Sequence, residues 1–186
     1  GNNNRTDGGP RIKDAITQQV LTTSGVYVDA QEYQPVHVFI NGKYLAMMNV
    51  REPSNRYHGV ANYGYEEDEM DGFEYSTGSY HQRGGTREAF DKLMMLSEEA
   101  ETEEGYARIA ELLDMDEFAR YMAAVCYTGT GDWVLNSNNV KAYRSTDSGK
   151  FHFVFFDQDL TWEKTGNVEE IEGNEILDLY HNVKRS

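Results

Sequence analysis

The chain is short of cysteine, of basic residues and of long apolar runs, and each shortage excludes a class of protein. Its only cysteine, Cys126, rules out an intrachain disulfide framework and leaves the redox compartment open. Lys and Arg number 17 against 32 Asp and Glu, a formal net charge of -15. Nucleic acid and anionic membrane surfaces select Lys and Arg, so neither is an expected partner. No apolar stretch approaches the roughly 18 residues of a membrane-spanning helix, so we expect no transmembrane segment.

What remains is the composition of a folded, acidic domain. The chain has 186 residues, of which 39% are hydrophobic and 12% aromatic, and 13 of them are tyrosine. A chain of this length can bury a substantial core as one domain. Its charge suits a divalent cation or a basic protein segment as a partner.

The first half of the chain predicts a helix followed by a hairpin. Apolar residues recur at helical intervals in RIKDAITQQVL, which indicates a helix over residues 11–22. Asn41-Gly42 is a preferred pair for a two-residue hairpin turn, so we expect strands at 35–40 and 43–50. The following stretch, residues 54–85, is rich in Tyr, Gly and acid, and we interpret it as a long surface excursion.

The second half predicts three helices and another hairpin. We expect helices at 86–100, 103–113 and 115–129. Thr86 and Asp114 are candidate N-caps, because short polar side chains accept hydrogen bonds from the first free backbone N–H groups. VKAYR, a DSG turn and KFHFVFF then form the second hairpin. The predicted fold class is therefore α+β, with antiparallel hairpins and several helices.

Acceptor oxygens gather at the ends of the second hairpin. Asp132 and three asparagines precede it, and Asp157 and Asp159 follow it. Because the second strand of a hairpin returns beside the first, these two groups can meet in space. Asn and Asp are common turn residues, but their oxygens are also the ligands that Mg2+ requires, so the pattern alone leaves both interpretations open.

The order of these residues has a parallel in protein kinases. In their catalytic half an Asp that orients the acceptor hydroxyl is followed by an Asn, a hairpin and a metal-binding Asp. The kinase spacing of five residues from the first Asp falls on Ser137 here, so the strict motif is a weak match.

Longer blocks of the sequence resemble the spore-coat CotH kinase family, whose members are atypical, secreted or surface-located relatives of protein kinases. The matching blocks are RIKDAITQQV with VDAQEYQPVHVFINGKYLAMMNVRE, then DMDEFARYMAAVCYTGTGDW, then NNVKAYR with FHFVFFDQDLTW. They span most of residues 11–163. The resemblance implies a kinase-like fold forming a single domain over residues 1–186. It also implies that the upstream part of the N-terminal lobe, with the family's phosphate-binding Lys, is absent from this chain.

The resemblance also implies an active site. Asp132 would be the catalytic Asp, and Asn139 and Asp157 would bind the metal. Asn138 and Asp159 would assist them. Glu52, at the end of a strand along the adenine side, would help to bind the nucleotide.

The function implied is transfer of a phosphoryl group from ATP, with Mg2+ or Mn2+, to a Ser or Thr hydroxyl of a protein, at a secreted or cell-surface location. Two alternatives remain. One is a catalytically inactive surface or adhesion module that retains the fold. The other is a glycosyltransferase, because DQD resembles the metal-binding triplet of nucleotide-sugar enzymes. The chain shows no βαβ pattern to support that fold, so we rank the glycosyltransferase last.

Overall fold

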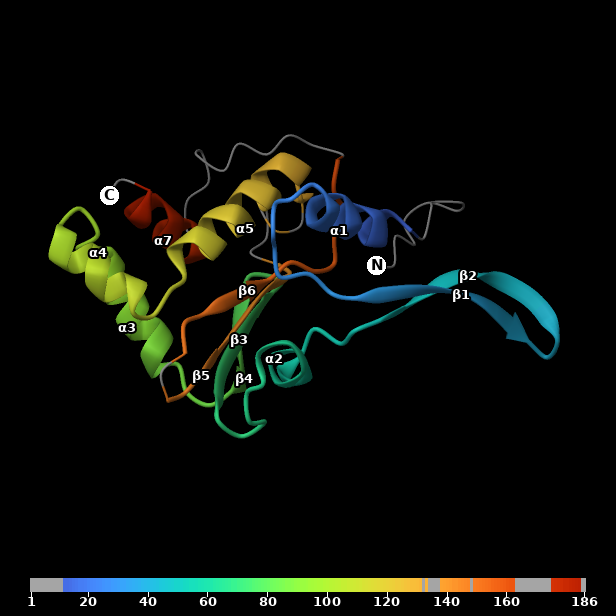
Figure 1. The fold of residues 1–186 in the computed structure, drawn as a ribbon, viewed down its shortest axis with the longest axis horizontal. Helices are drawn as coiled ribbons and strands as arrows, with labels where there is room; N and C mark the ends of the chain where they lie inside the picture. Colours follow the sequence, from blue (N-terminus) through green and yellow to red (C-terminus); the bar gives the residue numbers. More distant parts are fainter. Residues whose placement is uncertain (1–11, 132, 134–137, 148, 163–174, 185–186) are drawn as a thin grey trace.

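The computed structural model describes residues 12–131, 133, 138–147, 149–162 and 175–184, which form a mixed α+β fold as expected (Figure 1). In chain order the elements are α1 (Lys13–Thr23), β1 (Tyr33–Ile40), β2 (Lys43–Arg51), α2 (Arg56–Tyr63), β3 (Met70–Ser76), β4 (Ser79–Gly84), α3 (Glu88–Ser97), α4 (Glu103–Ala110), α5 (Met115–Thr128), β5 (Val140–Ser145), β6 (His152–Val154) and α7 (Glu175–Val183). Among these residues no helix combines the length and the apolarity that a bilayer crossing demands.

The strands form two antiparallel sheets, and both predicted hairpins are confirmed. β1 and β2 pair with each other around Asn41 and Gly42, whose φ angles of 51° and 76° match the left-handed turn that this pair favours. The other sheet has the order β4-β3-β5-β6. In it Lys141 of β5 lies opposite Val154 of β6 on one side and opposite Glu74 of β3 on the other.

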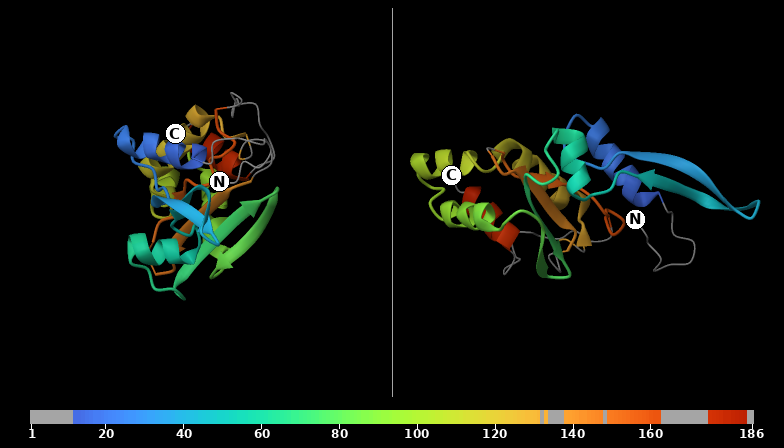
Figure 2. Two further views of the ribbon diagram at one scale, coloured as in Figure 1. Left: turned by 90° about the vertical axis from the view of Figure 1, so that its right-hand side faces the viewer. Right: turned by 90° about the horizontal axis from the view of Figure 1, so that it is seen from below.

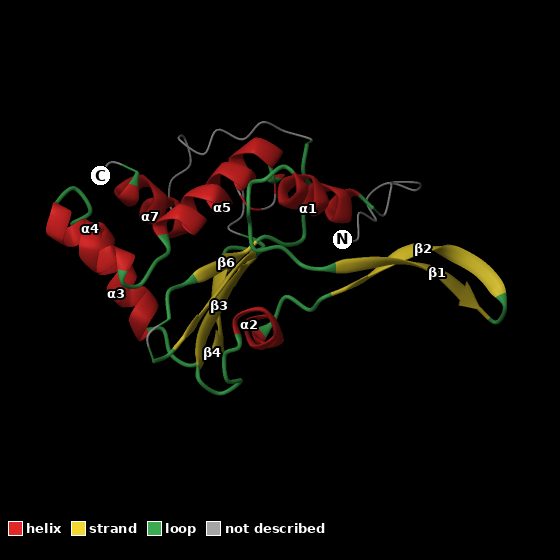
Figure 3. Cartoon of the chain, viewed as in Figure 1, coloured by secondary structure: helices red, strands yellow, loops and turns green. Residues whose placement is uncertain are grey.

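The β1–β2 hairpin extends away from the rest of the molecule (Figures 1 and 3). Many of its large apolar side chains are exposed to solvent, namely Phe39, Ile40, Tyr44, Leu45, Met47 and Val50. The hairpin therefore adds little to the core described below.

The main core lies between the four-stranded sheet and the helices α3, α5 and α7, which Figure 2 shows from two further directions. Val140 and Ala142 of β5 point into this core and are fully buried. The alternate residues Lys141 and Tyr143 point to the opposite face, where Tyr143 packs with Val154 and Phe156 near α2. The sheet therefore has one face for the main core and one that faces α2.

The prediction of a long surface excursion over residues 54–85 is wrong. This stretch contains α2 and both strands of a hairpin, and β3 is a central strand of the sheet. Phe73 and Tyr75 are spaced two apart and lie buried in the core. The acids that suggested a solvated loop include Glu74, which pairs with Arg83 and Lys141 on the other face. The alternation of apolar and polar residues in β3 indicates a strand, but the acidic composition of the segment obscured this signal.

The three helices of the second half are confirmed with shorter bounds, and one of their two predicted caps is correct. Asp114 caps α5, because its carboxylate accepts a hydrogen bond from the backbone N–H of Glu117. Thr86 is not the N-cap of α3, since Arg87 occupies that position. The backbone N–H of Thr86 instead donates to Asp71 of β3 at 2.9 Å, which fastens this residue to the sheet before the helix begins.

Candidate functional site

The β5–β6 hairpin brings two of the predicted site residues to one end of the sheet. Asn139 directly precedes β5, and Asp157 follows β6 by three residues. Lys141 and Val154 are opposite each other in the antiparallel ladder, so the entry to β5 and the exit from β6 lie side by side. Asp132, the predicted catalytic residue, lies outside the described residues.

Both of these residues have an unusual backbone conformation. Asn139 has a φ of 60° and Asp157 a φ of 52°, in the left-handed region that non-glycine residues rarely adopt. Asn and Asp tolerate this region better than other side chains, yet the surrounding structure must still hold them there. Such residues cluster at functional sites, so the conformation is consistent with a binding role for this end of the hairpin.

The side chains at this end offer the donor atoms that a hard cation requires. The Asn139 Nδ2 atom is buried and has no hydrogen-bond partner among the described residues. A half-turn of the amide places Oδ1 at the same position, where it can accept a metal ion or a donor. Asp157 and Asp159 are partly exposed carboxylates. Asn138 differs, because its Oδ1 accepts a hydrogen bond from the Thr77 N–H at 3.0 Å in the β3–β4 turn.

The exit from β6 is fastened by a buried carboxylate on α1. Asp14 is 3% exposed, and its Oδ1 accepts hydrogen bonds from the backbone N–H of Gln158 and from the Gln18 side chain, both at 2.7 Å. Its Oδ2 forms an ion pair with Arg51 at the end of β2. Asp14 thus connects α1, the outer hairpin and the residue next to Asp157.

Two partly buried cations lie within electrostatic reach of Asp157. Burial lowers the pKa of the Lys141 ammonium, against the opposing charges of Glu74 and Asp157. Burial likewise lowers the pKa of Arg51, and the charge of Asp157 opposes that shift. Two positive charges therefore lie near the end of the hairpin that carries Asp157.

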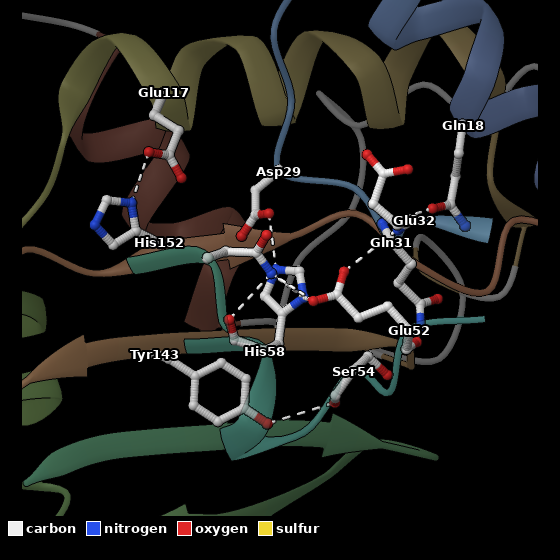
Figure 4. A network of polar contacts seen from close by, with 11 residues as sticks. Gln18, Asp29, Gln31, Glu32, Glu52, Ser54, His58, Glu117, Tyr143 and His152 are labelled. Carbon is white, nitrogen blue, oxygen red and sulfur yellow. Dashed lines mark hydrogen bonds and ion pairs between the residues drawn. The ribbon is translucent and has the colours of Figure 1, made fainter. Parts of the chain in front are cut away.

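Glu52, the predicted nucleotide-binding residue, takes part in a buried polar network (Figure 4). Its Oε1 accepts a hydrogen bond from the Asn62 amide at 2.5 Å and lies 3.3 Å from Nδ1 of His58. The other ring nitrogen of His58 lies 2.8 Å from Asp29. His58, 1% exposed, therefore sits between two carboxylates that come from either end of the β1–β2 hairpin.

The charge of this histidine follows from its neighbours. Burial lowers the pKa of His58, but the hydrogen bond and charge of Asp29, together with Glu52, outweigh that effect and leave the pKa raised. A protonated His58 joins α2 to both ends of the hairpin. This network positions the backbone around Glu52 where β2 leads into α2.

The described residues contain no group of three or more His, Cys, Asp or Glu arranged to hold a metal ion. The predicted site differs in kind from such a group, because it combines an amide with carboxylates and includes Asp132, which is not described. The assignment of Asp132, Asn139, Asp157, Asn138, Asp159 and Glu52 therefore remains a prediction.

Sequence reasoning missed the residues that support this region. Arg51 contacts Asp14 across 37 positions of the chain, His58 contacts Asp29 across 29, and Asp14 contacts Gln158 across 144. No local pattern marks such partners. The one available signal was an acid, Asp14, within the helical stretch of residues 11–22, but its orientation toward the core depends on the fold.

Comparison with known proteins bears on the whole chain. A family model described as CotH kinase protein matches residues 2–184. No curated protein sequence matches the chain. The match extends over nearly all the elements of the fold and includes both hairpins.

Proposed function

The chain belongs to the CotH kinase protein family, whose model covers nearly its whole length, and from this membership we propose that it transfers the terminal phosphoryl group of ATP to a Ser or Thr hydroxyl of a protein. The observation that carries the proposal is the hairpin geometry. It brings Asn139 and Asp157, each in a left-handed conformation, to one end of the sheet, and their order along the chain parallels that of the metal-binding residues of protein kinases.

We assign the direct metal ligands to Asn139 and Asp157. A bound Mg2+ or Mn2+ would neutralise the charge of the phosphate oxygens and orient the terminal phosphate. The amide oxygen of Asn139, whose Nδ2 is buried without a partner among the described residues, and the carboxylate of Asp157 are suitable donor atoms. Asn138 and Asp159 flank these ligands, and Asn138 fixes the loop through its bond to Thr77.

Asp132 is assigned the role of the base. Its carboxylate would accept the proton of the acceptor hydroxyl as the oxygen attacks phosphorus, and ADP would leave with the electrons of the broken P–O bond. The predicted position of Asp132, seven residues before Asn139, places it on the same segment that enters β5.

Glu52 is assigned to the adenine side of the site. Its carboxylate is held by Asn62 and lies near His58, at the point where β2 leads into α2. Both backbone groups of Glu52 are already bonded, the N–H to the Glu32 carbonyl at 2.9 Å and the C=O to the Gln31 side chain, so contact with the nucleotide is assigned to the carboxylate. We also propose, from the family alone, a secreted or cell-surface location.

Calorimetric titration of the full chain with ATP, with and without Mn2+, tests the metal and nucleotide assignment. We expect binding only with metal, and loss of that binding in Asp157→Ala. Asp116→Ala is a matched control, because Asp116 is an exposed acid on α5. Equal binding by wild type and Asp157→Ala would contradict the assignment.

Transfer itself requires a separate assay. We expect the chain to transfer labelled phosphate from ATP to a library of basic Ser/Thr peptides, and Asp132→Ala to reduce the rate by at least about a hundredfold, the typical contribution of a positioned base. Binding of nucleotide without transfer, by wild type as well as by Asp132→Ala, would support the inactive surface module instead.

A further inference from the structure

A cavity of about 400 Å³ lies between the start of α2 and the strands β3, β4 and β5. This volume falls in the range of pockets that bind small ligands or a single large side chain. The cavity is on the face of the sheet that carries α2, opposite the main core. Nothing in the roles assigned above uses it.

The charge of the cavity is opposite to that of the chain. Its lining includes three cations, Arg56, Arg83 and Lys141, and one carboxylate, Glu74, a formal net charge of +2. The whole chain carries -15. A local excess of positive charge in an acidic protein selects an anionic group for this one position.

The single carboxylate is shared between two of the cations. Arg83 donates through Nε to one oxygen of Glu74 at 2.7 Å, and the Lys141 Nζ lies 3.4 Å from the other oxygen. A guanidinium has further N–H donors in a planar fork that matches phosphate and carboxylate oxygens. The partner of Arg56 is Glu67, at 2.5 Å, which does not line the cavity.

Lys141 forms the inner end of the cavity. Its side chain is 13% exposed, its ammonium bonds to Ser54 at 3.0 Å, and it lies 4.4 Å from the ring centre of Phe156. Its carboxylate partner in the cavity lining, Glu74, is shared with Arg83, so the lining holds fewer negative than positive charges around this buried ammonium. An anion in the cavity would supply the missing counter-charge.

The cavity adjoins the proposed metal site. Asn139 directly precedes β5 and lies two positions before Lys141, so the cavity and the proposed metal site are neighbours along the chain. The charge of Asp157 reaches Lys141. At the outer end Arg56 and Arg83 are about half exposed, with relative exposures of 50% and 46%, so the cavity is open to a side chain from another protein.

We propose that this cavity receives a phosphoserine or phosphothreonine side chain of the acceptor segment, so that a segment already phosphorylated positions its next hydroxyl for transfer. The inference rests on the proposed function, which places the nucleotide phosphates at the metal end of the site. A dianionic phosphate matches the net charge of +2. The acidic remainder of the protein disfavours extended acidic peptides, so the match is to one anionic group within an otherwise basic or neutral segment.

Calorimetric titration of the full chain with O-phospho-L-serine, in low salt and without nucleotide, tests the cavity by itself. We expect binding of O-phospho-L-serine, none of L-serine, and affinity roughly tenfold lower in Arg83→Gln, which removes a charge-assisted hydrogen bond. Arg108→Gln is a matched control, because Arg108 pairs with Glu99 at 3.0 Å and is 44% exposed on α4. Arg56→Gln, a change at a half-exposed helix residue, provides a second test if Arg83→Gln lowers the melting temperature.

The outcomes separate this inference from the proposed function. Phosphoserine binding that survives Asp157→Ala, while binding of ATP with Mn2+ is lost, supports both proposals. Failure of wild type to bind phosphoserine, or equal affinity in wild type, Arg83→Gln and Arg56→Gln, overturns the cavity assignment alone. Displacement of phosphoserine by ATP and Mn2+ would show that the cavity holds nucleotide phosphate and would overturn the acceptor role. Phosphoserine binding by a chain that never binds ATP would also overturn that role.

Discussion

Asp14 is the residue whose replacement tests most directly how the outer hairpin and the candidate site are held together. It is 3% exposed and contacts Arg51, Gln18 and the backbone of Gln158. In Asp14→Ala all three contacts are lost at once. The guanidinium of Arg51, whose Nε and Nη2 are already buried without partners among the described residues, would then lose its ion pair as well.

The expected loss of stability is large because a charge is left buried. Removing one partner of a buried ion pair typically destabilises a protein by about 3 to 5 kcal/mol. The side chain of Arg51 is 16% exposed, so water relieves part of this penalty, and we expect a loss near 3 kcal/mol. For a chain of 186 residues, one kcal/mol corresponds to roughly 2 to 4 °C in melting temperature. Asp14→Ala should therefore lower the melting temperature by roughly 6 to 12 °C.

Urea denaturation and thermal melting, each followed by circular dichroism, measure this loss. Asp91→Ala is a suitable control, because it breaks an ion pair of 2.6 Å with Arg87 in which Asp91 is 60% exposed, and it should cost no more than about 1 kcal/mol. Asp14→Asn retains acceptor capacity toward Gln158 and should fall between the two. If Asp14→Ala were no more destabilising than Asp91→Ala, the proposed connection between α1, β2 and the β6 exit would be wrong.

Three further predictions concern other parts of the fold. The pKa of His58 is raised above its ordinary 6.5, so its protonation stabilises the folded state. This contribution is fully present below pH 6.5 and is lost as the pH rises through the folded-state pKa. Urea titrations across pH 5 to 9 should show the decline in the free energy of unfolding, and His58→Gln should flatten it. Asp114→Ala removes the N-cap of α5 and should reduce the free energy of unfolding by about 1 kcal/mol, measured by the same titration, whereas an unchanged midpoint would mean that the cap contributes nothing. Gly85→Ala would place a Cβ 2.2 Å from the Asp71 carboxylate at a φ of 58°, and it should destabilise the fold by well over 1 kcal/mol. Gly25 has a φ of 82° but open space around the position of a Cβ, so Gly25→Ala should cost only about 1 kcal/mol. Equal melting temperatures for the two variants would refute the role of the close contact.

The parts of the fold that could be predicted were those with local signals. Asn41-Gly42 determines its own turn, and the helical spacing of apolar residues in 103–113 and 115–129 marks two helices without knowledge of their neighbours. The pattern of the second hairpin likewise predicted that the segments carrying Asn139 and Asp157 would lie at the same end of the sheet. Antiparallel pairing alone carries that conclusion.

The parts that could not be predicted depend on contacts between distant segments. β3 is a central strand because β5 pairs with it from about 70 residues away, and its acidic residues are neutralised by partners on β4 and β5. The cationic cavity has the same origin, since Arg56, Arg83 and Lys141 come from three different elements. The acidic composition of residues 54–85 suggested a solvent-exposed segment, because the sequence alone does not show which charged residues form ion pairs in the fold.

The outer hairpin has a consequence for the local dynamics of the chain. Within the described part of the chain each of its strands pairs with one neighbour, so both are sheet edges, and a two-stranded ribbon is only marginally stable by itself. Its opening requires little of the global unfolding free energy, because its exposed apolar side chains leave no large buried surface to lose. Amide hydrogens between β1 and β2 should exchange with solvent long before those of β3 and β5. The contacts of His58 and Arg51 fix the two ends of the ribbon to the rest of the fold. They therefore mark the boundary between a segment that opens locally and a region that opens only on global unfolding.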